Sequence, residues 1–177
     1  MSHPSNFESP EATLSNNDLS FIALCNEYCA AIENTSLSTP DDFIDNMLRI
    51  LPRIYISATD IKADLTFGEG AYIPQSLTED TYDTVRQRLA ALLGEDDTYL
   101  EVFVEDMKYS DTPIAASVSE SLADLFQVFY DFLETCRDAP NDLIVEALAS
   151  VRESFADFWS QTLVNVLRAI NAIKFNL

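Results

Sequence analysis

Carboxylates are the most numerous groups in this sequence that could do chemistry. The chain has 177 residues, with 30 Asp and Glu against 10 Lys and Arg, so its formal net charge is −20. Carboxylates can transfer protons, hold cations or attract basic partners. The one histidine, His3, lies near the start of the chain, so a Ser–His or Cys–His nucleophile pair lacks a plausible base. We find no catalytic motif and expect no bound cofactor.

The densest acidic block spans residues 95–111, where seven carboxylates stand against Lys108 alone. Aromatic residues are interleaved with these acids. One interpretation is a surface connection that its aromatic residues anchor to the rest of the protein. The alternative is a recognition surface for a basic partner, because an acidic cluster with exposed aromatics gives both steering and contact. The candidate partner-binding residues are Glu95, Asp96, Asp97, Tyr99, Glu101, Glu105 and Asp106.

A second acidic pattern is helical. Glu120 and Asp124 are four residues apart, and the same polar stripe continues through Gln127 and Asp131. A solvated helix face is the simpler interpretation, because surface helices present one polar side. The sharper hypothesis is that Glu120 and Asp124 face a polar groove and bind a cation or a basic partner.

Three cysteines are present, and two of them, Cys25 and Cys29, are also four residues apart. This spacing places both on one helix face, where free cysteines usually serve as small core residues. A redox or soft-metal pair is the alternative. A structural zinc site needs four ligands from Cys and His, which these residues do not supply.

The elements that must position these groups are helical. The chain has only three glycines, and apolar residues recur at helical spacing along most of it. We predict a disordered tail over residues 1–14 and one helical domain over residues 15–177. The fold class is an all-α, single-domain bundle of about five amphipathic helices.

Capping signals and prolines set the expected helix boundaries. The first helix should begin near Asn17, and the second at Thr39-Pro40 with a kink at Pro52. A third should run from Thr78 to Gly94, with Tyr82 on its buried face. We expect a fourth helix to start at Thr112-Pro113 and a long C-terminal helix to start at Pro140, with Phe158 on its apolar stripe.

Several segments of the chain form a recognisable set. They are FIALCNEYC at 21–29, LPRIY at 51–55, VRQRLAALLGEDDTY at 85–99, ESLADL at 120–125 and FADFW at 155–159. Together they extend over nearly the whole predicted domain, and they resemble the uncharacterised bacterial family called domain of unknown function 5063. The resemblance implies a small helical cytosolic protein. The family carries no assigned activity, so no catalytic residue is transferred.

Composition narrows the function classes. The start of the chain lacks the pattern of a signal peptide, and no run of about 18 apolar residues exists, so we expect a cytoplasmic protein without a membrane span. Direct binding of nucleic acid is not expected, because phosphate contacts need clustered Lys and Arg. Our leading hypothesis is a non-enzymatic, acidic interaction or adaptor protein that binds a basic protein partner. Its oligomeric state is left open.

Two alternatives remain. The first is a nucleic-acid mimic that inhibits a nucleic-acid-binding protein. A domain of this mass exposes roughly 8,600 Å², or about one net charge per 430 Å². B-DNA carries close to one charge per ~110 Å², about four times as dense, so a mimic would need its acids gathered on one side. The second alternative is a carboxylate-based divalent-cation binder or enzyme.

Overall fold

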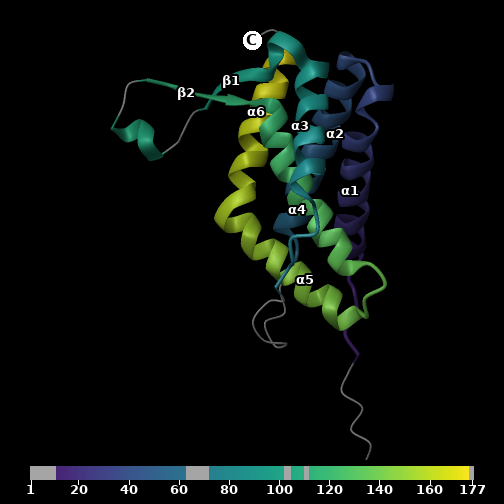
Figure 1. Ribbon diagram of the computed structural model, residues 1–177. Helices are drawn as coiled ribbons and strands as arrows, with labels where there is room; N and C mark the ends of the chain where they lie inside the picture. Colours follow the sequence, from purple (N-terminus) through teal and green to yellow (C-terminus); the bar gives the residue numbers. More distant parts are fainter. Residues whose placement is uncertain (1–10, 63–71, 102–104, 110–111, 176–177) are drawn as a thin grey trace, which may run out of the picture.

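The computed structural model describes residues 11–62, 72–101, 105–109 and 112–175. These residues form a bundle of helices with a two-stranded antiparallel sheet at its side (Figure 1). The all-α fold class predicted from the sequence is confirmed. In chain order, the elements are α1 (Asn16–Glu33), η1 (Thr35–Leu37), α2 (Pro40–Thr59), α3 (Glu79–Leu93), η3 (Gly94–Asp97), β1 (Thr98–Glu101), η4 (Glu105–Lys108), β2 (Ile114–Ser117), α4 (Val118–Cys136), α5 (Asn141–Ser154), η5 (Phe155–Trp159) and α6 (Ser160–Phe175).

Hydroxyl caps start the helices as the sequence predicts. The side chains of Thr39 and Thr78 accept from the backbone N–H groups of Asp42 and Thr81, which α2 and α3 would otherwise leave unpaired. Gly94 follows α3 with a φ of 57°, a conformation that side chains disfavour. Helix α2 continues through Pro52, which lies inside it.

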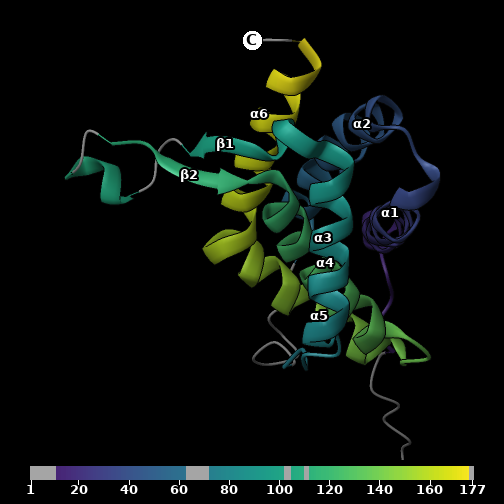
Figure 2. The ribbon, with the colours of Figure 1, turned by 45° about the horizontal axis from the view of Figure 1, so that its top comes forward.

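The start of the fourth helix differs from the prediction at Thr112-Pro113. Residues Ile114–Ser117 instead form β2, which pairs with β1 so that Thr98 faces Ser117 and Glu101 faces Ile114. Helix α4 begins only at Val118, where the Ser117 hydroxyl caps it. Pairing with β1 satisfies the backbone of this segment, so a contact between distant residues overrides the local helix signal. Figure 2 shows the hairpin extending away from the bundle.

The long C-terminal helix is divided into α5 and α6 by the π-helical turn η5. The extra residue of a π turn rotates the faces of the helix beyond it. As a result Phe155 and Trp159 are buried, while Phe158, which the sequence places on the buried stripe, is 54% exposed. The Trp159 indole donates to the carbonyl of Val151 at 3.1 Å.

Aromatic side chains join the helices at the centre of the core. Trp159 packs edge-to-face on Phe129, with ring centroids 5.2 Å apart, and Phe21 and Tyr28 also contact Phe129. The buried hydroxyl of Tyr28 donates to the carbonyl of Leu122 at 2.7 Å. These contacts hold α1, α4 and the η5 turn in one arrangement.

The predicted disordered tail, residues 1–14, lies mostly outside the described residues, and so does His3. Its last residues differ from the prediction. Ala12 is buried, and its backbone N–H donates to Asp142 at 3.0 Å, while Leu14 packs against the core. Two apolar side chains therefore extend the domain a few residues earlier than the composition indicates. Among the described helices, none is both long and apolar enough for a membrane span.

Candidate functional site

The acidic block 95–111 divides into groups with different roles. Glu95 and Asp96 are exposed in η3, whereas the carboxylate of Asp97 is used in hydrogen bonds within the protein. Its two carboxylate oxygens accept from the backbone N–H and the hydroxyl of Ser119, each at 2.7 Å. Because Ser119 lies in the first turn of α4, Asp97 fixes the start of that helix beside the hairpin.

The far part of the block lies in the outer segment of the hairpin. Glu105 is exposed in η4, where it forms a 3.9 Å ion pair with Lys108, and Asp106 belongs to the same short helix. Figure 1 shows η4 away from the bundle. Glu105 and Asp106 are therefore separated in space from the candidate partner-binding residues of η3 and β1, with which the sequence analysis grouped them.

Tyr99 points toward α4, and Glu101 lies beside it. The Tyr99 hydroxyl lies 3.1 Å from the Ser121 hydroxyl and 3.5 Å from a carboxylate oxygen of Glu101. Burial raises the pKa of Tyr99, so this phenol stays protonated and available as a donor. The contact with Ser121 joins the acidic block to the polar stripe of α4.

Asp124 of that stripe accepts a 2.7 Å hydrogen bond from the hydroxyl of Tyr82 on α3. The pKa of Asp124 is raised, chiefly because the carboxyl is half-buried, while the hydrogen bond from Tyr82 acts in the opposite direction and nearby Glu120 adds to the increase. Burial and the same bond raise the pKa of Tyr82. The pair therefore retains its proton on the phenol.

The structure thus joins two sets of residues that the sequence treated separately. Ser121, which contacts Tyr99, lies one turn before Asp124 on α4, and the negative charge of Asp124 contributes to the raised pKa of Tyr99. We define the acidic face as Tyr82, Tyr99, Glu101, Glu120 and Asp124. Sequence reasoning missed Tyr82 and assigned it to the buried stripe of its helix. Its phenol was the available signal, because a buried tyrosine hydroxyl usually needs a polar partner.

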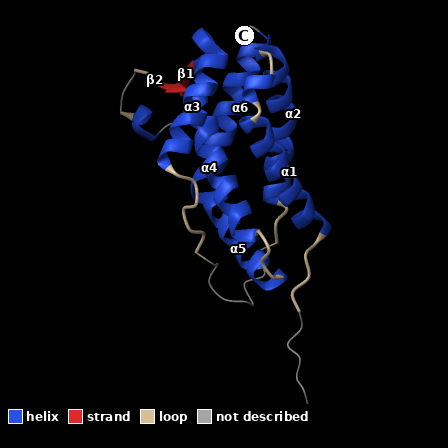
Figure 3. Cartoon of the chain, turned by 45° about the vertical axis from the view of Figure 1, so that its right-hand side comes forward, coloured by secondary structure: helices blue, strands red, loops and turns tan. Residues whose placement is uncertain are grey.

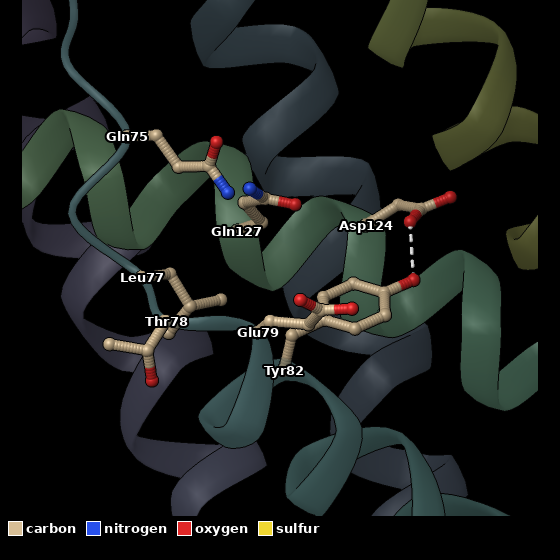
Figure 4. Close-up of a pocket in the computed structure, with 7 residues that line it drawn as sticks. All are labelled: Gln75, Leu77, Thr78, Glu79, Tyr82, Asp124 and Gln127. Atoms are coloured by element: carbon tan, nitrogen blue, oxygen red, sulfur yellow. Dashed lines mark hydrogen bonds between the residues drawn. The ribbon is translucent and has the colours of Figure 1, made fainter.

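A hollow of about 300 Å³ opens beside the Tyr82–Asp124 pair. Figure 4 shows the amide side chains of Gln75 and Gln127 on one side of it and the Tyr82–Asp124 hydrogen bond on the other. Its lining residues are Gln75, Leu77, Thr78, Glu79, Tyr82, Asp124 and Gln127. Carboxylate and amide oxygens accept hydrogen bonds, so this hollow is suited to a guanidinium or ammonium group.

Asp131 lies in the same stripe but is buried, contrary to the solvated face expected for it. Its Oδ1 accepts from the backbone N–H groups of Ser76 and Leu77, both at 2.8 Å. This carboxylate holds the segment that leads into α3 and forms one wall of the hollow. Periodicity could not reveal this role, because the partners are 54 and 55 residues away.

The other candidate chemistries find less support in the geometry. Across the described ranges, no three His, Cys, Asp or Glu side chains are placed to hold one metal ion. Cys25 and Cys29 are buried free thiols, as the core interpretation predicts, and burial raises both pKa values. Burial also raises the pKa of Cys136, to about 11. Thiols with such pKa values are poor nucleophiles at neutral pH.

A solved structure and a family model match this chain. A crystal structure of protein BF1032 from Bacteroides fragilis superposes with a TM-score of 0.79 and is 30% identical in sequence. The match covers 92% of this chain and 95% of that one. None of the curated proteins matches the chain. The family described as domain of unknown function (DUF5063) matches residues 12–176. The family match extends over nearly the whole chain, and the protein therefore belongs to this family of helical domains.

Proposed function

We propose that the protein is a non-enzymatic interaction protein whose acidic face binds a basic protein partner. The observation that carries the proposal is the Tyr82–Asp124 pair beside an open polar hollow, with Glu120 close enough to raise the pKa of Asp124 and the Tyr99–Glu101 pair joined to α4 through Ser121. These groups come from α3, β1 and α4, so the bundle holds them in a fixed relation. A preformed surface loses little conformational entropy on binding.

The chemistry of the face favours arginine or lysine. Tyr82 occupies one oxygen of Asp124, and the amides of Gln75 and Gln127 line the same hollow. A guanidinium presents several donors in one plane and stacks on aromatic rings, so both the acceptors and the phenol rings suit it. The net charge of −20 would in addition speed the encounter with a basic protein.

We also propose a cytoplasmic, bacterial setting. In the part of the chain that the structure describes, Cys25, Cys29 and Cys136 are all free thiols. Free thiols fit a reducing compartment. The structural relative from Bacteroides fragilis supports the bacterial source.

A defined probe tests the acidic face. Binding of a short, fluorescein-labelled, arginine-rich peptide is followed by anisotropy at low and at high salt. The double variant Glu120→Gln with Asp124→Asn removes two charges from the face, while the new amide oxygen at position 124 can still accept from Tyr82. Each exposed ion pair contributes up to about 1 kcal/mol to binding. We therefore expect the double variant, which loses two charges, to bind the peptide about fivefold more weakly or more.

The matched control is Asp60→Asn with Glu153→Gln, which removes one charge directly after α2 and one charge on α5. We expect it to weaken binding less than about twofold. Circular dichroism verifies that both variants fold. Equal weakening by the two double variants would mean that the peptide senses only net charge, and binding unaffected by salt would exclude charge-led recognition. Either result contradicts the proposal.

A further inference from the structure

An apolar groove runs between α2 and α6, away from the acidic face. These helices pack along each other (Figure 3). The groove has a volume of about 580 Å³. Its lining residues are Leu48, Pro52, Val164, Leu167, Arg168, Asn171 and Phe175. Five of these seven side chains are apolar, although the groove opens to solvent.

Both walls of the groove expose apolar side chains where a surface helix normally presents polar ones. Val164 is 47% exposed and Phe175 is 59% exposed on the α6 wall, while Leu48 and Pro52 on the α2 wall are half-buried. Scattered exposed apolar residues need no explanation, but a continuous set across two packed helices is typical of an interaction site.

The charge of the groove is opposite to that of the whole protein. Its only charged lining residue is Arg168, and no carboxylate lines it, although the chain has 30. Within the described residues Arg168 forms no ion pair, whereas Lys174 at the end of α6 is held by Asp45 at 2.8 Å. One unpaired guanidinium therefore remains available at the groove.

We propose that this groove binds an amphipathic helix of a partner protein that carries apolar anchors and one or two carboxylates beside them. The wall from Val164 to Phe175 is about 16 Å long at 1.5 Å per residue, which matches three turns of a docked helix. Apolar residues at positions i, i+3 or i+4, and i+7 would fill the groove. A flanking carboxylate would meet Arg168.

A second copy of this chain fits the groove less well. Two copies meeting through the same groove would offer Arg168 no carboxylate, because the groove lining has none, while each copy carries a net charge of −20. A partner segment with a long run of acids is also disfavoured, because the negative net charge of this protein would repel it. A neutral helix with a few well-placed acids avoids both repulsions, because charges beyond about 8 Å are screened at physiological salt.

Selection from a displayed library of helical peptides tests this inference. Clones are selected on the wild-type protein and counter-selected on the Val164→Asp variant, which removes peptides that bind elsewhere. The surviving sequences are then synthesised and measured by fluorescence anisotropy. We expect them to carry apolar residues at helical spacing with Asp or Glu at the flanks.

Variants separate the groove from general effects. Arg168→Glu should weaken the selected peptides about tenfold and favour versions with Lys at the flanks. Leu143→Asp is the matched control, because Leu143 lies on α5 and is 48% exposed, close to the 47% of Val164. We expect it to leave affinity unchanged. Circular dichroism shows that each variant folds.

Three results would overturn the inference. The first is that no clone survives counter-selection. The second is that survivors carry Lys or Arg at the flanks and are unaffected by Arg168→Glu. The third is a dimer in sedimentation velocity that Val164→Asp dissociates, which would make the groove an interface between two copies. None of these outcomes bears on the acidic face, whose test uses a different probe and different variants.

Discussion

Replacing Asp131 tests how the wall of the hollow is held in place. The Asp131→Ala variant removes two hydrogen bonds to the backbone N–H groups of Ser76 and Leu77. A hydrogen bond to a charged group contributes about 1.5–3 kcal/mol, and a buried donor left unpaired adds its desolvation cost. Leu77 is buried, whereas Ser76 is exposed and water can replace its partner. We therefore expect the free energy of unfolding to fall by about 3–4 kcal/mol.

The Asp131→Asn variant is the control for this loss. Both backbone groups donate to Oδ1, and an asparagine keeps one carbonyl oxygen that can accept from both. Only the charge is removed, so we expect the free energy of unfolding to fall by about 1 kcal/mol. For a chain of this length, 1 kcal/mol corresponds to roughly 2–4 °C in the melting temperature. The alanine variant should therefore melt roughly 10 °C below the wild type.

Urea unfolding followed by circular dichroism measures the free energies, and hydrogen exchange of the Ser76 and Leu77 amides gives a local readout. In the alanine variant these two amides should exchange about tenfold faster or more, while amides of α1 follow the global stability. Equal destabilisation by Ala and Asn would refute the reasoning, because the charge and not the pair of backbone bonds would then matter. Unchanged exchange at Ser76 and Leu77 would refute it as well.

Two further predictions concern titration and thiol access. Because the pKa of Asp124 is raised in the folded protein, the native state takes up this proton at a higher pH than the unfolded chain. The wild type should therefore gain stability relative to Asp124→Asn as the pH falls from neutral toward the ordinary range of Asp near 4, which urea unfolding at several pH values would measure. A loss of stability relative to Asp124→Asn over the same pH range would contradict the raised pKa of Asp124. Alkylation of the native protein, followed by mass spectrometry, should modify Cys136 first and reach the buried Cys25 and Cys29 only on unfolding. Rapid alkylation of all three cysteines would contradict the burial of Cys25 and Cys29 in the core.

Local patterns in the sequence were sufficient for the helices and most of their starts. Thr39, Pro40 and Thr78 act at the helix ends that they predict, because capping depends on residues within one turn. The apolar stripes likewise predicted the buried positions of Cys25 and Cys29, because a helix repeats its faces every 3.6 residues. The exposed Phe158 is an exception, since one extra residue in η5 shifts that repeat.

The candidate site could be predicted only in part. Glu120, Asp124 and Tyr99 were recognised as residues of interest from charge and spacing. Their grouping was not, because it depends on β2 pairing with β1 and on α3 lying against α4. Tyr82 is 42 residues from Asp124, so no local pattern joins them.

The sequence by itself determined an acidic, helical chain with a defined family resemblance and an aromatic core. These properties follow from composition and from interactions within a few residues. Only the tertiary structure decided which carboxylates are used internally, as Asp97 and Asp131 are, and which remain on a surface, as Glu120 does. The physical reason is that a carboxylate has the same charge in every context, while its partners come from whichever distant segment the packing brings within hydrogen-bond distance.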